Sequence, residues 1–239
     1  MNILEPFEDK IKIIVSPLSM FIMTSGYLSS IVILRNFMKN RNSYRLKHLM
    51  QFYNLSQIIL NIYMICGIYK YSFISKKTNL FGINLMYNSN IEYYVFVHYL
   101  SKYFDYIDTI FIILKKADRQ LTFLHVYHHS TIGIIWGSLL YIGHGNGTVM
   151  FGCLINSIIH TLMYSHYLCA SFGIYNPFKK IVTQAQIFQF VLCIIHSISV
   201  MIWENICPRH LAWFQFIYQI QMIMLFTHFY KNNYRKIKL

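Results

Sequence analysis

The chain has 239 residues, of which 56% are hydrophobic and only 12% are charged. Ordinary soluble domains carry about 25% charged residues, so this composition excludes a small soluble globule and predicts that lipid covers much of the surface. The net charge of +13 predicts an anionic partner, which can be anionic lipid, a phosphate-rich ligand or both. We expect no nucleic acid as a partner. The five cysteines show no CxxC spacing, so we expect neither a disulfide framework nor a thiolate metal site.

Seven apolar segments approach the roughly 20 residues that a helix needs to cross a bilayer. We predict spans at about 16–34, 49–69, 91–114, 121–140, 148–170, 181–203 and 209–230. The connections are mostly short and the sequence has no internal repeat, so we predict one integral membrane domain over residues 1–239. The predicted fold class is all-α, a polytopic membrane protein with seven transmembrane helices.

The distribution of basic residues predicts the orientation of these spans. Fourteen of the 21 Lys and Arg residues fall in segments 35–48, 115–120 and 171–180 and in the tail. The positive-inside rule assigns these segments to the cytosol, which gives a lumenal N-terminus and a cytosolic C-terminus. The first residues are acidic where a signal peptide would be basic, so we expect the first span to be retained. The sequon at 146–148 lies so close to the membrane that we expect no glycan on it.

The third span contains His98, Lys102, Asp105 and Asp108 within an apolar sequence. The three charged residues would cost roughly 8–10 kcal/mol at the bilayer centre if unpaired, whereas the apolar residues of the span return about 4–7 kcal/mol. The charged face must therefore meet protein or a water-filled cavity. Lys102 and Asp105 are one turn apart and are expected to pair. The alternative is a buried ion pair that only orders the helices.

Three further spans carry polar residues on one helical face. In the fourth span, His125, His128 and His129 share a narrow face. The other two stripes contain Asn156, His160, Met163, Tyr164 and Tyr167 in the fifth span, and Thr183, Gln186 and Gln189 in the sixth. A rise of 1.5 Å per residue sets these groups and Asp105 roughly 12–15 Å from the cytosolic ends of their spans. The common depth predicts one polar chamber, and the alternative is a coincidence of unrelated buried residues.

Basic residues flank the same cytosolic side. The candidates for binding phosphate groups are Lys115, Lys116, Arg119, Lys179, Lys180 and Arg235. Clustered cations attract anionic substrates. Their role as topology signals on solvated loops explains them equally well.

The histidines allow more than one chemical interpretation. Imidazole can act as a nucleophile, a base or an acid near neutral pH. Membrane di-iron oxidases such as desaturases also use HxxHH, but they need several such boxes, and here only residues 125–129 fit. We expect no metal and no other cofactor, and a di-iron lipid oxidase is the alternative function. A receptor, a transporter and histidines with a purely structural role are the further alternatives.

Five motifs occur in order over residues 91–234. They read KYFDYIDT at 102–109, HVYHH at 125–129, NSIIHTLMYSHY at 156–167, TQAQIFQ at 183–189 and LFTHFYKNNY at 225–234. In order and spacing they resemble the motifs of the ELO family of very-long-chain fatty acid elongases, the 3-oxoacyl-CoA synthases. Asp105 stands where the family has Glu, and His166 where it has Tyr, which puts rate and substrate fit in question.

The resemblance implies helices around an acyl-chain tunnel that opens to the cytosol, in the endoplasmic reticulum membrane. It implies an acyltransferase that condenses a long-chain acyl-CoA with malonyl-CoA to give 3-oxoacyl-CoA, CoA and carbon dioxide. His128 matches the family's proposed nucleophile and would form an acyl-imidazole. His160 would bind the malonyl thioester or stabilise the enolate, and His125 and His129 would orient or protonate. Binding or supporting roles are expected for Lys102, Asp105, Asp108, Thr109, Asn156, Met163, Tyr164, Tyr167, Gln186 and Gln189.

Cys153 is a rival nucleophile, because soluble condensing enzymes use cysteine, but it lies two turns deeper than His160. The expected partners are acyl-CoA, malonyl-CoA and membrane lipid. A homodimer, and contacts with the reductases and dehydratase of the elongation cycle, are further partners that the resemblance allows.

Overall fold

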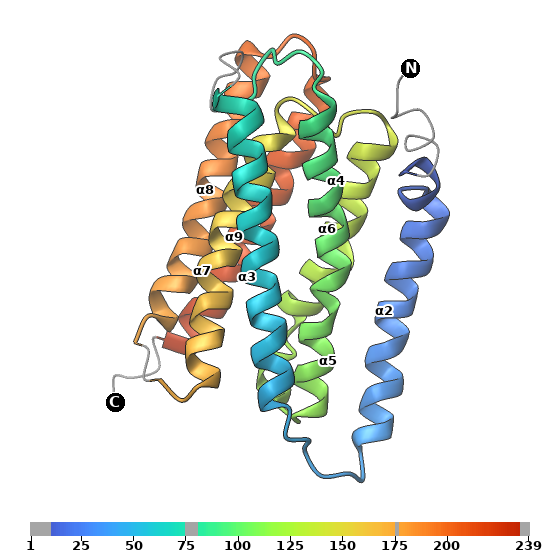
Figure 1. Ribbon diagram of the computed structural model, residues 1–239, viewed down its shortest axis with the longest axis vertical. Coiled ribbons are helices and arrows are strands. Elements are labelled where there is room, and N and C mark those ends of the chain that lie inside the picture. The colour runs from blue at the N-terminus through green and yellow to red at the C-terminus, as the bar shows by residue number, and fades with distance from the viewer. Residues whose placement is uncertain (1–10, 75–80, 175–176, 235–239) are drawn as a thin grey trace. The chain divides into compact units, whose positions relative to one another are not determined.

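The computed structural model of the chain describes residues 11–74, 81–174 and 177–234. Within these ranges the secondary structure is helical and contains no strand (Figure 1). The α-helices are α2 (Pro17–Met38), α3 (Lys47–Tyr69), α4 (Ser89–Phe104), α5 (Tyr106–Leu114), α6 (Phe123–Tyr141), α7 (Val149–Ser171), α8 (Lys179–Trp203) and α9 (Arg209–Tyr234). A π-helical turn, η1 (Lys70–Ile74), continues α3, and a 3-10 turn, η2 (Asp118–Gln120), precedes α6. The all-α prediction is confirmed.

The predicted count of seven helices is not confirmed, because the third predicted segment contains two helices. α4 ends at Phe104 and α5 begins at Tyr106, with Asp105 between them. The amide of Asp105 still donates to the carbonyl of Ser101, but the amide of Asp108 donates only three residues back, to the carbonyl of Asp105, at 3.1 Å. The chain is therefore wound more tightly here than an α-helix. Aspartate favours such positions because its side chain competes with the helical backbone.

Among the described residues, three helical segments are long and apolar enough to cross a membrane. They are α2, α3 with the first part of η1 (Lys47–Ser72), and α8. Large apolar side chains on them, such as Phe21, Ile33 and Phe188, are exposed, as lipid-facing residues are. These properties agree with the membrane protein that the composition predicts. The other four of the seven predicted spans stay predictions.

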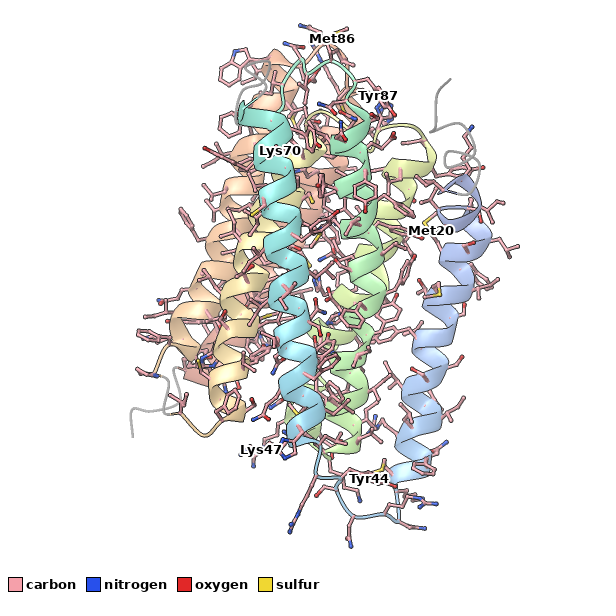
Figure 2. The ribbon with its side chains drawn as sticks, viewed as in Figure 1. Met20, Tyr44, Lys47, Lys70, Met86 and Tyr87 are labelled. Carbon is pink, nitrogen blue, oxygen red and sulfur yellow. The ribbon has the colours of Figure 1, made fainter. Side chains whose placement is uncertain are left out.

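The chain divides into two compact units, which are described separately. The first comprises residues 1–46 and 95–145 and contains α2, most of α4, α5 and α6. α2 packs against α5 and α6, and Figure 2 shows Met20 near one end of α2 and Tyr44 beyond the other. The buried core of this unit contains Tyr27, Ile31, Met38, Tyr106 and Ile113.

Glycines on α6 allow neighbouring helices of the first unit to approach it closely. A Cβ atom on Gly137 would lie 2.4 Å from Sδ of Met20 and 2.8 Å from a ring carbon of Tyr99. A Cβ atom on Gly133 would lie 3.1 Å from the ring of Tyr103. Small residues serve this purpose in membrane helices, where close packing drives association.

The second unit comprises residues 47–94 and 146–239 and contains α3, α7, α8 and α9. α3 packs on α7, α7 on α8, and α8 on α9 (Figure 1). α3 and α7 run antiparallel: the hydroxyls of Tyr53 and Tyr164 lie 3.4 Å apart, and Oγ of Ser72 donates to Sδ of Met150 at 3.0 Å. The single domain predicted over residues 1–239 stays a prediction.

Polar side chains fasten the loops at one end of the second unit, the end where Figure 2 shows Lys70, Met86 and Tyr87. The side-chain amide of Asn84 donates to the carbonyl of Trp203 at 2.9 Å, and its Oδ1 accepts from the amide of Asn205 at 2.9 Å. These two bonds connect the loop before α4 to the loop before α9.

The carboxylate of Glu204 completes this connection. Only 4% of the residue is exposed, and its Oε2 accepts from the backbone amide of Asn84 at 2.8 Å. Its Oε1 accepts from the amides of Ile206 at 2.7 Å and Cys207 at 3.4 Å. Glu204 therefore accepts hydrogen bonds from backbone amides of the loops. Buried amides without a hydrogen-bond partner would cost free energy.

The loop that carries the sequon belongs to the same end. The side-chain nitrogen of Asn146 donates to the carbonyl of Asn88 at 2.6 Å, which supports the expectation that it carries no glycan. Gly147 has a φ of +65° and Gly82 a φ of +66°, and a Cβ atom on Gly82 would lie 2.5 Å from the carbonyl oxygen of Gly147. Glycine is therefore required for both the backbone conformation and the close approach.

Candidate active site

The three histidines of HVYHH lie at the start of α6. The helix begins because Oγ1 of Thr122 accepts a hydrogen bond from the amide of His125. The ring centroids of His125 and His129 lie 4.4 Å apart, and those of His128 and His129 lie 5.5 Å apart. His129 is buried, whereas His125 and His128 are partly exposed. The predicted single histidine face is confirmed.

A chain of hydrogen bonds holds the ring of His125. Its Nε2 lies 2.7 Å from Oγ1 of Thr109, on α5. The same Oγ1 lies 3.1 Å from the hydroxyl of Tyr27, on α2. Thr109 thus makes a direct contact with His125, and the supporting role expected for Asp108 stays a prediction.

The predicted ion pair in the third segment is present. Nζ of Lys102 lies 3.6 Å from Oδ2 of Asp105, and both side chains are buried. Asp108 is partly exposed, in the first turn of α5. His98, also predicted in this polar stripe, is buried with its ring edge-on to Trp136, at a centroid distance of 4.6 Å. The charge of Lys102 is thus partly balanced within its own unit.

The polar residues of α7 lie in the second unit. His160, Met163 and Tyr164 are buried, and the ring of His160 meets that of Tyr164 edge-on at 5.7 Å. Asn156 is partly exposed, whereas Tyr167 is 42% exposed. Most of the predicted stripe therefore faces the protein interior, and Tyr167 lies at its margin.

α7 and α8 bring two further motif residues together. Nε2 of Gln186 lies 3.3 Å from Sδ of Met163, and Gln189 is buried one turn further along α8. Gln186 therefore contacts the α7 stripe, whereas for Gln189 the proximity to it stays a prediction. Their predicted role as oxyanion donors stays a prediction.

The amide-rich face of α3 was not predicted as part of the site. Asn54, Gln57 and Asn61 are at most 3% exposed, and Nε2 of Gln57 donates to the hydroxyl of Tyr53 at 2.8 Å. The antiparallel pairing of α3 with α7 sets Gln57 level with His160. Their spacing of three and four residues in an apolar segment was the available signal.

The two last motifs meet at the other end of the second unit. Oγ1 of Thr183 lies 3.4 Å from the hydroxyl of Tyr234, which also donates to the carbonyl of Lys179 at 3.3 Å. Nζ of Lys180 lies 6.0 Å from the ring centroid of Tyr230. The end of α9 therefore braces the start of α8, where two of the candidate phosphate-binding lysines lie.

The sequence profile described as ELO: GNS1/SUR4 family matches residues 12–238. The chain belongs to the ELO family. It is 44% identical over 213 residues to the Leishmania major protein named Fatty acid elongase 5, covering 89% of this chain and 84% of that relative. It is 42% identical over 209 residues to Fatty acid elongase 4 of Trypanosoma brucei brucei, covering 87% and 81%. It is 36% identical over 226 residues to Very long chain fatty acid elongase 5 of Mus musculus, covering 90% and 74%.

The family membership confirms the resemblance drawn from the five motifs. In this ELO protein the motif residues divide between the two units. The first holds KYFDYIDT and HVYHH, and the second holds the other three motifs. The predicted meeting of His128 with His160 involves both units and stays a prediction.

The basic candidates of the ELO protein also occur in both units. In the first unit Lys115, Lys116 and Arg119 are exposed after the end of α5. In the second, Lys179 and Lys180 are exposed at the start of α8, and Arg235 lies outside the described residues. The rival nucleophile Cys153 is fully buried on α7.

Proposed function

We propose that this ELO protein is a 3-oxoacyl-CoA synthase. It would condense a long-chain acyl-CoA with malonyl-CoA, giving a 3-oxoacyl-CoA two carbons longer, CoA and carbon dioxide. Membership of the family and the named elongase relatives show the coarser activity, fatty acid elongation by a membrane enzyme. The observation that supports the finer activity best is the face of three neighbouring imidazoles on α6, one of them held by a hydroxyl chain.

The reaction divides into two transfers. In the first, a neutral nitrogen of His128 attacks the acyl thioester, the acyl–nitrogen bond forms, and CoA leaves as its thiolate. In the second, malonyl-CoA loses carbon dioxide, and its enolate attacks the acyl carbonyl, so a carbon–carbon bond forms and the imidazole is released. Covalent capture replaces one difficult step by two easier ones.

The surroundings of His128 support its role as nucleophile. Its Nδ1 is enclosed and forms no hydrogen bond with the described residues, so no donor competes for a lone pair there. Oxyanions that develop during both transfers would accept hydrogen bonds from amides such as those of Asn156 and Gln189.

The second unit supports the proposed orientation in the endoplasmic reticulum membrane, with the N-terminus lumenal and the C-terminus cytosolic. Nε2 of Gln51, next to the Lys47 end of α3, donates to the carbonyl of Ser171, so the α7–α8 connection that precedes Lys179 and Lys180 lies at this end. Glu204 lies at the opposite end. Lys179 and Lys180 therefore lie with Lys47 at one end of this unit, which the positive-inside rule assigns to the cytosol. The lysines would also attract the phosphates of CoA.

The test incubates the purified protein with a long-chain acyl-CoA and malonyl-CoA radiolabelled at its free carboxylate. A synthase releases labelled carbon dioxide only when both substrates are present. Oxygen consumption without malonyl-CoA would instead support the di-iron oxidase alternative. Labelled acyl-CoA alone should give an acyl-enzyme in the wild type and in Cys153→Ala, and none in His128→Ala. Acyl-enzyme that survives in His128→Ala and is lost in Cys153→Ala would overturn the assignment of the nucleophile.

A further inference from the structure

Tyr27 lies in α2, a helix for which the sequence analysis predicts only a membrane-spanning role. Its side chain is buried, with 3% of the residue exposed. Its ring stacks on that of Tyr106 with centroids 4.1 Å apart and an angle of 21° between the planes. The stacking fixes where the phenol hydroxyl points. That hydroxyl lies 3.1 Å from Oγ1 of Thr109.

The order of donors along this chain follows from the chemistry of its members. A phenol is a stronger acid than an aliphatic alcohol, which favours donation from the hydroxyl of Tyr27 to Oγ1 of Thr109. The single proton of Thr109 is then directed at Nε2 of His125, 2.7 Å away. A ring nitrogen that accepts a hydrogen bond carries no proton, so the proton of a neutral His125 lies on Nδ1.

We propose that Tyr27 is a positioning residue for the condensation reaction, acting through Thr109 to fix the ring and the tautomer of His125. The proposal rests on the proposed function, in which His125 belongs to the reacting histidine face. It assigns to α2 a part in the site that neither the family motifs nor the histidine box contains. It also gives the Thr109 of KYFDYIDT a defined task.

The position of His125 explains why its tautomer matters. Its ring lies 4.4 Å from that of His129, which in turn lies 5.5 Å from that of His128. A change in which nitrogen carries the proton reverses the donor and the acceptor edge of the ring. Partners that orient a metal-bound histidine typically change metal affinity or activity by about 10–100-fold when they are removed, and we expect the lower end of this range for a histidine that binds no metal.

The experiment begins with four single variants of the full chain, to which a double variant and His125→Ala are added. Tyr27→Phe removes the hydroxyl and keeps the stacked ring, Thr109→Val removes the second hydroxyl, and Thr109→Ser restores it. The matched control is Tyr99→Phe, because Tyr99 is likewise buried and its hydroxyl is hydrogen-bonded, donating to the carbonyl of Ile14 at 3.1 Å and accepting from the hydroxyl of Tyr103 at 2.9 Å. Each variant is measured for melting temperature, kcat, KM for acyl-CoA, and the protonated nitrogen of His125 by nitrogen NMR.

We expect Nδ1 of His125 to be protonated in the wild type, Thr109→Ser and the control, and a mixture of tautomers in Tyr27→Phe and Thr109→Val. We expect kcat to fall about 10-fold in Tyr27→Phe with KM unchanged. The double variant Tyr27→Phe/Thr109→Val should be no slower than Thr109→Val, because both act on one path.

Two results overturn the proposal. One is an unchanged tautomer of His125 in Tyr27→Phe. The other is a double variant in which the fold-decrease in kcat equals the product of the fold-decreases in the two single variants. The tautomer measurement does not depend on activity, so it separates failure of this proposal from failure of the proposed function. If His125→Ala retains wild-type condensation, the proposed role of the histidine face fails even where the hydroxyl chain is real.

Discussion

The replacement of Glu204 by glutamine tests how the loops of the second unit are held. The carboxylate accepts three backbone hydrogen bonds, with Oε1 serving Ile206 and Cys207 and Oε2 serving Asn84. In Glu204→Gln one oxygen can still accept, but the new NH2 group faces a donor 2.8 Å away. Hydrogen bonds to charged groups contribute about 1.5–3 kcal/mol each. The loss of one bond and the weakening of the others should lower the free energy of unfolding by about 3 kcal/mol.

The assay is thermal unfolding of the purified protein in detergent, followed by tryptophan fluorescence. For a chain of this size, about 3 kcal/mol corresponds to a fall in Tm of roughly 6–12 °C. The matched control is Glu92→Gln, because Glu92 also lies in the second unit and accepts from the hydroxyl of Tyr87 in an exposed contact. The free energy of unfolding of the control variant should fall by less than about 1 kcal/mol. Equal melting temperatures for the two variants would refute the structural role assigned to Glu204.

Three further predictions concern packing and a thiol. Gly137→Ala should lower Tm and kcat together, measured on purified protein, because the new methyl group would collide with the side chain of Met20. Gly82→Ala should lower Tm by several degrees without changing KM, because its positive φ and the carbonyl of Gly147 leave no room for Cβ. Burial raises the pKa of the Cys207 thiol, outweighing a hydrogen bond to Thr148. Less thiolate is then present at pH 8, so maleimide should label Cys207 more slowly in the folded protein than in denaturant.

The apolar segments could be predicted closely, because the length needed to cross a membrane constrains them. The predicted span 181–203 compares with the observed α8, Lys179–Trp203. The break at Asp105 could not be predicted, because the apolar pattern continues through it. It depends instead on a local hydrogen bond from Asp108.

The site residues that could be predicted are polar or charged side chains within apolar segments. Imidazoles and charges in the third and fourth segments are costly in lipid, so their positions alone indicated a site. Tyr27 gave no such signal, because a tyrosine in a membrane helix is common, and its link to His125 requires α2, α5 and α6 to be packed. The amides of α3, Asn54 and Gln57 among them, share one helical face, and their spacing in the sequence is the signal that indicates it.

The glycines of α6 have a consequence beyond the space they leave. Gly137 lies twelve residues from His125, a separation of ~18 Å along the helix axis. If a methyl group at residue 137 tilted α6 by about 5°, His125 would move by about 1.5 Å. That displacement is enough to break a hydrogen bond of 2.7 Å. A small rotation of α6 is thus amplified along its length. The position of the histidine rings therefore depends on Gly133 and Gly137, two residues without side chains.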